Sequence, residues 1–152
     1  SQGHARAQNH LAGLYERGEA VSHSRHECLK WYRRAAEQGN DLAQYNLARM
    51  LDQSDDALSW YHKSAYQGNT LSQAELGYHY QTENEVAAFK GFRLAAEHSH
   101  SDAQYQLGLM YRNGRGTEIH FVEAIHWLRR AAEQDHLPAI GALQKLEHSQ
   151  KV

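Results

Sequence analysis

Apolar residues recur along this chain every three or four positions, within two sequence phrases that alternate. The first phrase, Ala-Gln-x-x-Leu-Ala-x-x-Tyr at residues 7–15, returns in related form from residues 43, 72 and 103. The second phrase, Trp-Tyr-Arg-Arg-Ala-Ala-Glu-Gln-Gly-Asn at residues 31–40, returns at 60–69, 91–100 and 127–136. Because a spacing of three or four residues keeps side chains on one helix face, each pair of phrases predicts a helix–turn–helix repeat.

Four such repeats are expected, at residues 5–40, 41–69, 70–100 and 101–136, followed by a capping helix over 137–148. They differ in length only in the link between the two helices of a repeat, which is shorter in the second and third. A stacked repeat tolerates such deletions, because its core faces its neighbours while its loops point outward. The predicted fold class is all-α: a right-handed superhelical solenoid that occupies residues 1–152 as a single domain.

Residues at the expected helix ends agree with these boundaries. Gly39 and Gly68 follow the last apolar position of a helix, where a left-handed residue is usually needed. Thr70 and Ser101 are each followed three residues later by glutamine, which predicts a capping box at the start of the next helix, and Asp41 begins a looser version. Pro138 is expected in the first turn of the last helix, where its missing N–H costs nothing.

Composition and charge narrow the classes of function. The chain has 152 residues, of which 41% are hydrophobic and 22% charged, and its net charge is −2. That balance predicts no nucleic-acid partner, and no apolar run approaches the ~20 residues that membrane insertion requires. The single cysteine, Cys28, excludes an intramolecular disulfide framework. The opening Ser-Gln-Gly-His aligns with residues 37–40, the end of a second helix, and this predicts a segment excised from a longer protein.

The two phrases together resemble the Sel-1-like repeat, a relative of the tetratricopeptide repeat. The resemblance rests on Ala-x-x-x-Leu-Gly-x-x-Tyr, Gly-x-Gly and Ala-x-x-Trp-Tyr-x-x-Ala-Ala-Glu-Gln-Gly-Asn, and it covers residues 5–136. The chain departs from the pattern at Gly91, which replaces the tryptophan of the third repeat, and in the shortened links. The resemblance implies a role in assembling complexes, often in bacterial signalling, envelope maintenance or host interaction.

The alignment of the repeats also assigns structural roles. One position of each second helix carries a small residue, which lets neighbouring helices approach: Cys28, Ala57, Ala88 and Ala124. Cys28 is therefore expected to be buried rather than reactive. The tryptophans three residues later are expected to fill gaps between helices. Because Gly91 lacks that side chain, the third repeat is predicted to show the weakest protection from hydrogen exchange.

No catalytic constellation is recognisable, so the chain is not expected to be an enzyme. It lacks Ser-x-x-Lys, Gly-x-Ser-x-Gly, His-Glu-x-x-His and Gly-Lys-Ser/Thr. Among its 12 histidines, His23 and His26 lie near Cys28 and form the best candidate for a metal group. The repeat register assigns Cys28 to the interior, however, so neither a metal nor a cofactor is expected.

Two other sets of histidines have structural interpretations. His4, His100 and His136 align with Asn40 and Asn69 and are expected to be turn residues. His79 is different, because it aligns with a position that is leucine or methionine in the other repeats. A hydrogen-bonded core histidine is the favoured interpretation of His79, and contact with a ligand is the alternative.

The remaining candidate for function is a face of the first helices. If the leucine of each first phrase points inward, the residues two positions before and after it share another face, which is expected to line the concave groove. Tyrosine and arginine are frequent among binding hot spots, so this face is predicted to hold a partner. Its candidate residues are Asn9, Arg17, Tyr45, Arg49, Tyr78, Tyr105, Leu109 and Arg112. Packing within the repeat is an equal alternative for Tyr45 and Tyr105, whereas Tyr78 and Arg49 are less typical of the motif.

The sequence therefore predicts a non-enzymatic adaptor that binds a peptide or protein partner in its concave groove. Two alternatives remain open. The first is an immunity or inhibitor protein that caps a toxin or an enzyme. The second is a hydrolase or a module that binds an envelope polymer, with part of its activity upstream. The pattern does not distinguish bacterial cytoplasm from periplasm, and it leaves the oligomeric state open.

Overall fold

The structure is a computed structural model that describes residues 2–18, 24–52 and 54–149. Within these residues all regular elements are helices. They are α1 (Gln2–Arg17), α2 (Arg25–Glu37), α3 (Asp41–Met50), α4 (Asp55–Tyr66), α5 (Thr70–Tyr80), α6 (Glu85–Glu97), α7 (Ser101–Asn113), α8 (Phe121–Ala132) and α9 (Leu137–Ser149). None of the described helices is long and apolar enough to cross a membrane.

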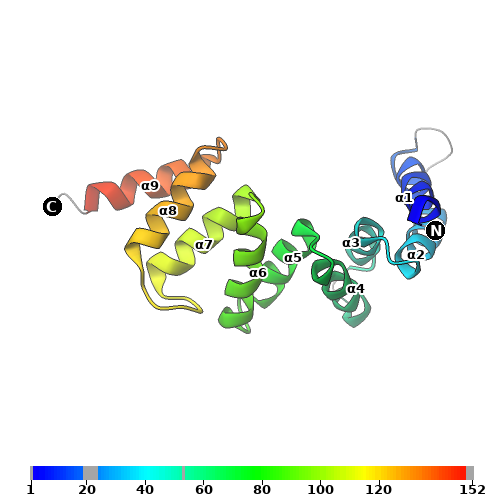
Figure 1. The fold of residues 1–152 in the computed structure, drawn as a ribbon, viewed down its shortest axis with the longest axis horizontal. Coiled ribbons are helices and arrows are strands. Elements are labelled where there is room, and N and C mark those ends of the chain that lie inside the picture. The colour runs from blue at the N-terminus through cyan, green and yellow to red at the C-terminus, as the bar shows by residue number, and fades with distance from the viewer. Residues whose placement is uncertain (1, 19–23, 53, 150–152) are drawn as a thin grey trace. The chain divides into compact units, whose positions relative to one another are not determined.

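The chain divides into two compact units (Figure 1), residues 1–72 and residues 73–152. In the N-terminal unit α1 packs against α2, α2 against α3, and α3 against α4. In the C-terminal unit α6 packs against α7, α7 against α8, and α8 against α9. Helix α5 begins in the first unit and ends in the second. Within each unit, helices that follow one another in the chain thus pack side by side.

Small side chains lie at the centre of the helix contacts. The shared small position of the second helices is buried in all four repeats, as predicted: Cys28, Ala57, Ala88 and Ala124 are at most 1% exposed. The tryptophans three residues later are partly buried, and each lies under a cation from the next helical turn. These pairs are Trp31 with Arg34, Trp60 with Lys63, and Trp127 with Arg130. The long cationic side chains therefore cover ring surface that the helices leave open.

The turns between repeats have a common geometry, but the helices begin one residue earlier than predicted. Gly39 and Gly68 have φ of +86° and +91°, the left-handed conformation expected after a helix. The helices that follow are capped by Asn40 and Asn69, whose Oδ1 atoms accept from backbone N–H groups at 2.8 and 3.0 Å. The predicted capping boxes were therefore wrong in register, because an asparagine amide caps as well as a hydroxyl and comes first.

The glutamine of each predicted capping box has a different role. Gln104 is fully buried in α7, where its Nε2 donates to the carbonyl of Ala96 at 3.1 Å. Its Oε1 accepts from Nε2 of Gln134 at 2.7 Å. Gln44 repeats both bonds in the N-terminal unit, to Ala36 and from Gln67. These amides link one repeat to the next, and each adds a side-chain donor to a helix-end carbonyl that also accepts from a backbone N–H, that of Gly39 or Ser99.

Replacing Gln104 with leucine, which has a similar volume, is expected to destabilise the C-terminal unit by about 1–3 kcal/mol. The substitution removes two hydrogen bonds of a buried amide, one to the Ala96 carbonyl and one from the Gln134 amide, and each contributes about 0.5–1.5 kcal/mol. Urea unfolding followed by circular dichroism measures the change. Gln144→Leu, at an exposed position of α9, is the matched control and should shift the midpoint little. Equal midpoints for the two variants would contradict this role.

Two histidine predictions were wrong. His4 is not a turn residue, because α1 begins at Gln2 and continues through it. Extending a helix adds one backbone hydrogen bond per residue, which favours helix over an isolated turn here. His79 is not in the core: it is exposed in the last turn of α5, with its ring 4.9 Å from that of Tyr80. An imidazole at a helix end keeps its hydration, which burial would remove.

Helices α5 and α6 approach unusually closely at the position where the third repeat lacks tryptophan. A Cβ atom on Gly91 would lie 2.8 Å from the backbone nitrogen of Gly77 and 2.9 Å from the carbonyl oxygen of Gln73. A Cβ atom on Gly77 would lie 2.7 Å from the ring of Phe92, which is fully buried. Two glycines thus allow a contact between helix backbones that no other residue pair permits.

Candidate functional site

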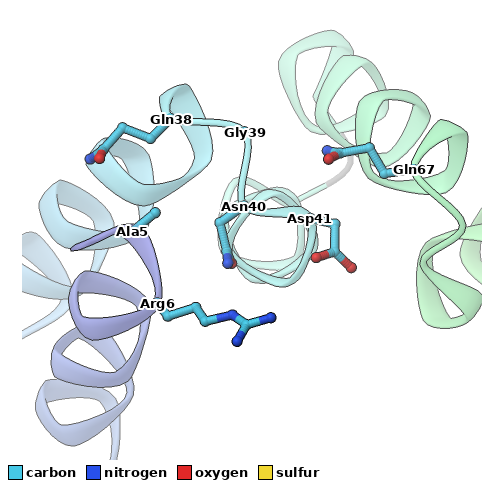
Figure 2. Close-up of a pocket in the computed structure, with 7 residues that line it drawn as sticks. All are labelled: Ala5, Arg6, Gln38, Gly39, Asn40, Asp41 and Gln67. Atoms are coloured by element: carbon cyan, nitrogen blue, oxygen red, sulfur yellow. The ribbon is translucent and has the colours of Figure 1, made fainter. Parts of the chain in front are cut away.

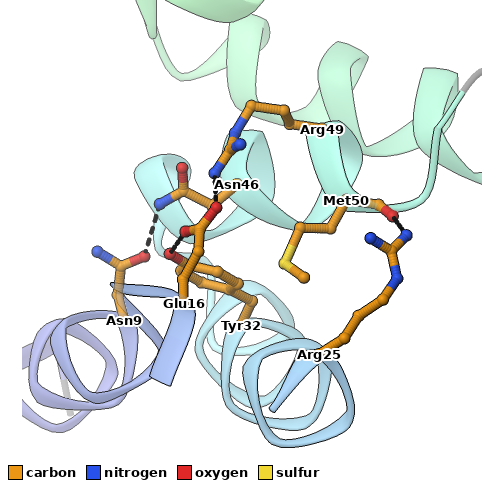
Figure 3. Close-up of polar contacts among 7 residues, drawn as sticks. All are labelled: Asn9, Glu16, Arg25, Tyr32, Asn46, Arg49 and Met50. Atoms are coloured by element: carbon orange, nitrogen blue, oxygen red, sulfur yellow. Dashed lines mark hydrogen bonds and ion pairs between the residues drawn. The ribbon is translucent and has the colours of Figure 1, made fainter. Parts of the chain in front are cut away.

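Helices α1 and α3 of the N-terminal unit present polar side chains to one another (Figure 3). Nδ2 of Asn46 donates to Oδ1 of Asn9 at 3.1 Å, and Nη2 of Arg49 donates to Oε1 of Glu16 at 2.5 Å. Helical spacing places Arg6 and Arg17 on the same side of α1 as Asn9. We call this surface the α1/α3 face: Arg6, Asn9, Glu16, Arg17, Tyr45, Asn46 and Arg49.

Glu16 joins this face to the interior of the unit. Its Oε2 accepts from the hydroxyl of Tyr32 on α2 at 2.7 Å, while Oε1 accepts from Arg49. Burial raises the pKa of the Glu16 carboxyl, but the hydrogen bonds from Arg49 and Tyr32 outweigh it, so the pKa is lowered. Burial, followed by the bond to Glu16, raises the pKa of Tyr32. The carboxylate is thus held in its charged form between three helices.

Acid is expected to weaken the N-terminal unit through Glu16. Since the pKa of Glu16 is lower in the folded protein, its stabilising effect is present above the ordinary value of 4.5 and disappears as the pH falls through the folded-state pKa. Glu16→Gln should destabilise the unit by about 1 kcal/mol at pH 7 and reduce its loss of stability below pH 4.5. Hydrogen exchange of α1–α3 at several pH values measures both effects.

The control for this prediction is Glu27→Gln, which removes a partly buried carboxylate of the same unit that pairs within its own helix, with Lys30 at 3.2 Å. A pair between neighbouring turns of one helix contributes only about 0.2–0.5 kcal/mol, so this variant should resemble the wild type at each pH. If Glu16→Gln left the acid dependence of α1–α3 unchanged, the stabilising role assigned to the Glu16 carboxylate would be wrong.

Cys28 lies beneath this face and is fully buried, as predicted. Burial raises the pKa of its thiol, and the charge of Glu16 raises it further. Both effects disfavour the thiolate, so Cys28 behaves as a small apolar side chain. Of the metal candidates, His23 lies outside the described residues and His26 is exposed on α2. No group of three metal-ligating side chains occurs among the described residues.

The four predicted binding residues of the C-terminal unit have mixed roles. Tyr78 is 39% exposed and its ring lies edge-on to Phe92, with centroids 4.9 Å apart. Tyr105 is half-buried, 4.9 Å from the ring of His136. Leu109 packs against the buried cluster around Leu128. These contacts give Tyr105 and Leu109 a structural role.

The fourth, Arg112, is half-buried near the end of α7, and its Nε donates to Oδ1 of the adjacent Asn113 at 3.1 Å. In the N-terminal unit, Tyr45 lies 6.1 Å from the ring of Tyr61, and Arg17 is exposed at the last turn of α1. The structure thus brings Asn9 and Arg49 together with two side chains that the sequence analysis did not select, Glu16 and Asn46.

A pocket of about 150 Å3 opens beside the first turns of α1 and α3 (Figure 2). Its walls come from α1, from the turn between α2 and α3, and from the end of α4, and the guanidinium of Arg6 extends toward the α3 wall. The lining residues are Ala5, Arg6, Gln38, Gly39, Asn40, Asp41 and Gln67. Sequence analysis did not select this pocket, although Arg6 stands where the other repeats carry Leu42, Leu71 and Asp102.

Comparison with known proteins identifies the repeats and the fold. The Sel1 repeat matches residues 5–40, 41–69, 70–100 and 101–136. The crystal structure of c5321, a protective antigen of uropathogenic Escherichia coli strains with an SLR fold, is similar at 36% identity and a TM-score of 0.87, over 95% of this chain and 34% of that one. A Sel1 repeat protein from Oxalobacter formigenes is 32% identical with a TM-score of 0.90, over 95% and 45% of the two chains.

An uncharacterised protein of Neisseria meningitidis serogroup B is 40% identical over 55 residues, which are 36% of this chain and 12% of that protein. The chain spans less than half the length of each of these three proteins. The all-α solenoid class predicted from the sequence is confirmed by the helices and by the two similar structures. Because the repeat pattern matches most of its length, the chain belongs to the Sel1 repeat family.

Proposed function

We propose that this chain is a non-enzymatic scaffold that holds a segment of a protein partner against the α1/α3 face. Sel1 repeat proteins are generally protein-interaction scaffolds, and that general role is the starting point. The α1/α3 face includes four of the residues predicted to line the groove: Asn9, Arg17, Tyr45 and Arg49.

The amide pair of Asn9 and Asn46 is the observation that carries the proposal. One bond joins Nδ2 of Asn46 to Oδ1 of Asn9, so Nδ2 of Asn9 and Oδ1 of Asn46 have no hydrogen-bond partner among the described residues. The pair therefore presents a donor and an acceptor from adjacent helices. A peptide group offers the complementary acceptor and donor, and an extended segment presents such groups repeatedly.

The side chains around the amide pair supply area and rigidity. Arg49 is fixed by Glu16 at 2.5 Å, and Glu16 is fixed in turn by Tyr32, so the guanidinium is ordered before a partner arrives. Ordering a side chain in advance reduces the entropy lost on binding. Tyr45 stands on α3 next to the amide pair and adds a half-buried ring, a frequent component of binding hot spots.

Crosslinking and pull-down from a native lysate test the proposal with two matched double variants. Asn9→Ala/Asn46→Ala removes the amide pair, and Arg33→Ala/Glu37→Ala changes two exposed residues of α2. Both must keep the helical circular dichroism and the melting temperature of the wild type. A partner retained by the α2 variant and lost by the amide variant is the expected result.

Two other outcomes have definite meanings. Partners that bind the amide variant and the wild type equally would move the binding surface away from the α1/α3 face and overturn the proposal. A single partner that is a toxin or an enzyme, and that is inhibited on binding, would make the chain an inhibitor that uses this same face. The affinity of the purified pair, measured for both variants, separates these cases.

A further inference from the structure

We propose that the pocket beside Arg6 binds a carboxylate of the partner, so that the segment held on the α1/α3 face is acidic. This inference rests on the proposed function and extends it from a peptide of any composition to one with an aspartate or glutamate side chain. The pocket lies within the N-terminal unit, and its Arg6 stands three residues before Asn9 on α1, which places both on one side of that helix. A segment anchored there continues directly along the amide pair.

Arg6 is an arginine without a counterion among the described residues. It forms no hydrogen bond or ion pair there, whereas Arg49, on the same face, pairs with Glu16. In Figure 2 its guanidinium extends from α1 toward the turn that begins α3. A guanidinium has five N–H donors in a planar fork that matches a carboxylate, so a carboxylate is the group that satisfies it best.

The other polar atoms of the pocket suit a peptide that carries this carboxylate. The Nε2 atoms of Gln38 and Gln67 donate to Gln8 and Gln44 at 2.6 and 2.8 Å, so each lining glutamine offers its Oε1 to a ligand N–H. Asn40 uses Oδ1 to cap α3 and offers Nδ2 as a second donor. Donors for a carboxylate and acceptors for backbone N–H groups thus line the same small space.

The charges around the pocket favour an acidic ligand. The α1/α3 face carries Arg6, Arg17 and Arg49 against the carboxylate of Glu16, while the pocket adds Asp41. One oxygen of Asp41 accepts from Nδ2 of Asn69 at 2.9 Å, which neutralises part of its field. Arginines therefore outnumber carboxylates at this site, although the whole chain has a net charge of −2. A carboxylate gains from this local excess of positive charge.

The site is a property of the first repeat and not of the repeat pattern. The position of Arg6 is occupied by Leu42 and Leu71 in the next two repeats and by Asp102 in the fourth. Asp102 already has a partner, since its Oδ1 lies 2.8 Å from Nε2 of His136. The cation is thus present at a single junction between repeats, as expected for an anchor that sets the register of a bound segment.

The inference is tested by titrating the full chain with two blocked tetrapeptides. Binding is monitored through the side-chain amide resonances of Asn40 and Gln67. The acidic probe is acetyl-Asp-Glu-Asp-Glu-amide, and its uncharged counterpart is acetyl-Asn-Gln-Asn-Gln-amide. The acidic probe is expected to shift both amides and the uncharged one to shift neither at the same concentration. Arg6→Gln should lower the affinity for the acidic probe about tenfold. Arg33→Gln, on the exposed side of α2, should change that affinity less than about twofold.

Equal weakening by Arg6→Gln and Arg33→Gln would mean unspecific attraction to a charged surface, and it would overturn the inference. Equal shifts from both peptides, or none from either, would overturn it as well. These failures are separable from failure of the proposed function. A partner that requires Asn9 and Asn46 while the acidic probe does not bind keeps the proposed function and removes the carboxylate anchor. If the acidic probe binds at Arg6 while the amide variant keeps its partner, the carboxylate site remains and the proposed function is overturned.

Discussion

Restoring tryptophan at position 91, where the other three repeats carry it, is expected to destabilise the C-terminal unit by about 3 kcal/mol. Consensus substitutions usually stabilise repeat proteins, so this expectation runs against the pattern. Its reason is the contact between α5 and α6, in which a Cβ atom at residue 91 would meet the backbone of Gly77 at 2.8 Å. Backbone atoms cannot move aside as the end of a side chain can, so the helices must separate and expose Phe92.

The smallest change at the same site provides the cleanest measurement. Gly91→Ala adds one methyl group, and in the interior of an unobstructed helix it would stabilise by about 0.5–1 kcal/mol. Here we expect destabilisation of about 1–3 kcal/mol. Gly141→Ala is the matched control, because a Cβ atom on Gly141 in α9 meets nothing within 4 Å. Urea midpoints that move in opposite directions for the two variants would support the contact.

Stabilisation by Gly91→Ala or by Gly91→Trp would contradict the close crossing of α5 and α6. Hydrogen exchange on the same samples also addresses the prediction that the third repeat has the weakest protection. That prediction assumed a space left by the missing tryptophan. With two helix backbones in contact at this position, protection of α6 similar to that of α8 would be the natural consequence.

The elements that the sequence predicted well are those governed by short-range periodicity. The leucine and alanine positions of the two phrases determine which face of each helix is buried, and Leu47, Leu107 and Ala88 are indeed fully buried. The cap residues were harder to predict, because Asn40 and Thr70 are both good caps and lie close to the same helix boundaries. Only the geometry of the turn decides which side chain reaches the backbone N–H.

The candidate site was less predictable, because its contacts join residues far apart in the chain. Asn9 and Asn46 are separated by 37 positions, and nothing in a single sequence pairs one asparagine with the other. Arg49 was selected because it departs from the repeat motif, whereas its partner Glu16 has no such signal. Arg6 did carry a signal, since no other repeat has a cation at that position, but its significance depends on the pocket that the turn at Asn40 creates.

Replacing three histidine caps with alanine at pH 7.5 is expected to destabilise the C-terminal unit by about 3 kcal/mol. Nδ1 of His100, His120 and His136 accepts from the third backbone N–H of α7, α8 and α9, at 3.2, 3.4 and 3.1 Å. The lone pair of Nδ1 is the acceptor in each cap, and alanine has no such atom. In the N-terminal unit the corresponding acceptors are Ser24, Asn40 and Ser54.

The size of the effect follows from what each histidine contacts. Asp102 lies 2.8 Å from Nε2 of His136, and the ring of Tyr105 lies 4.9 Å from its ring. His120 faces the ring of Tyr111. Losing a cap costs about 1 kcal/mol, so the loss of all three gives about 3 kcal/mol.

The triple variant His100→Asn/His120→Asn/His136→Asn is the matched control for the alanine variant, because asparagine already caps α3 and α5 of the same chain at equivalent positions. In urea at pH 7.5 its midpoint should lie close to that of the wild type. His62→Ala/His126→Ala, at exposed helix positions, should also change the midpoint little. Equal midpoints for the alanine and asparagine triple variants would exclude a capping role for the three histidines.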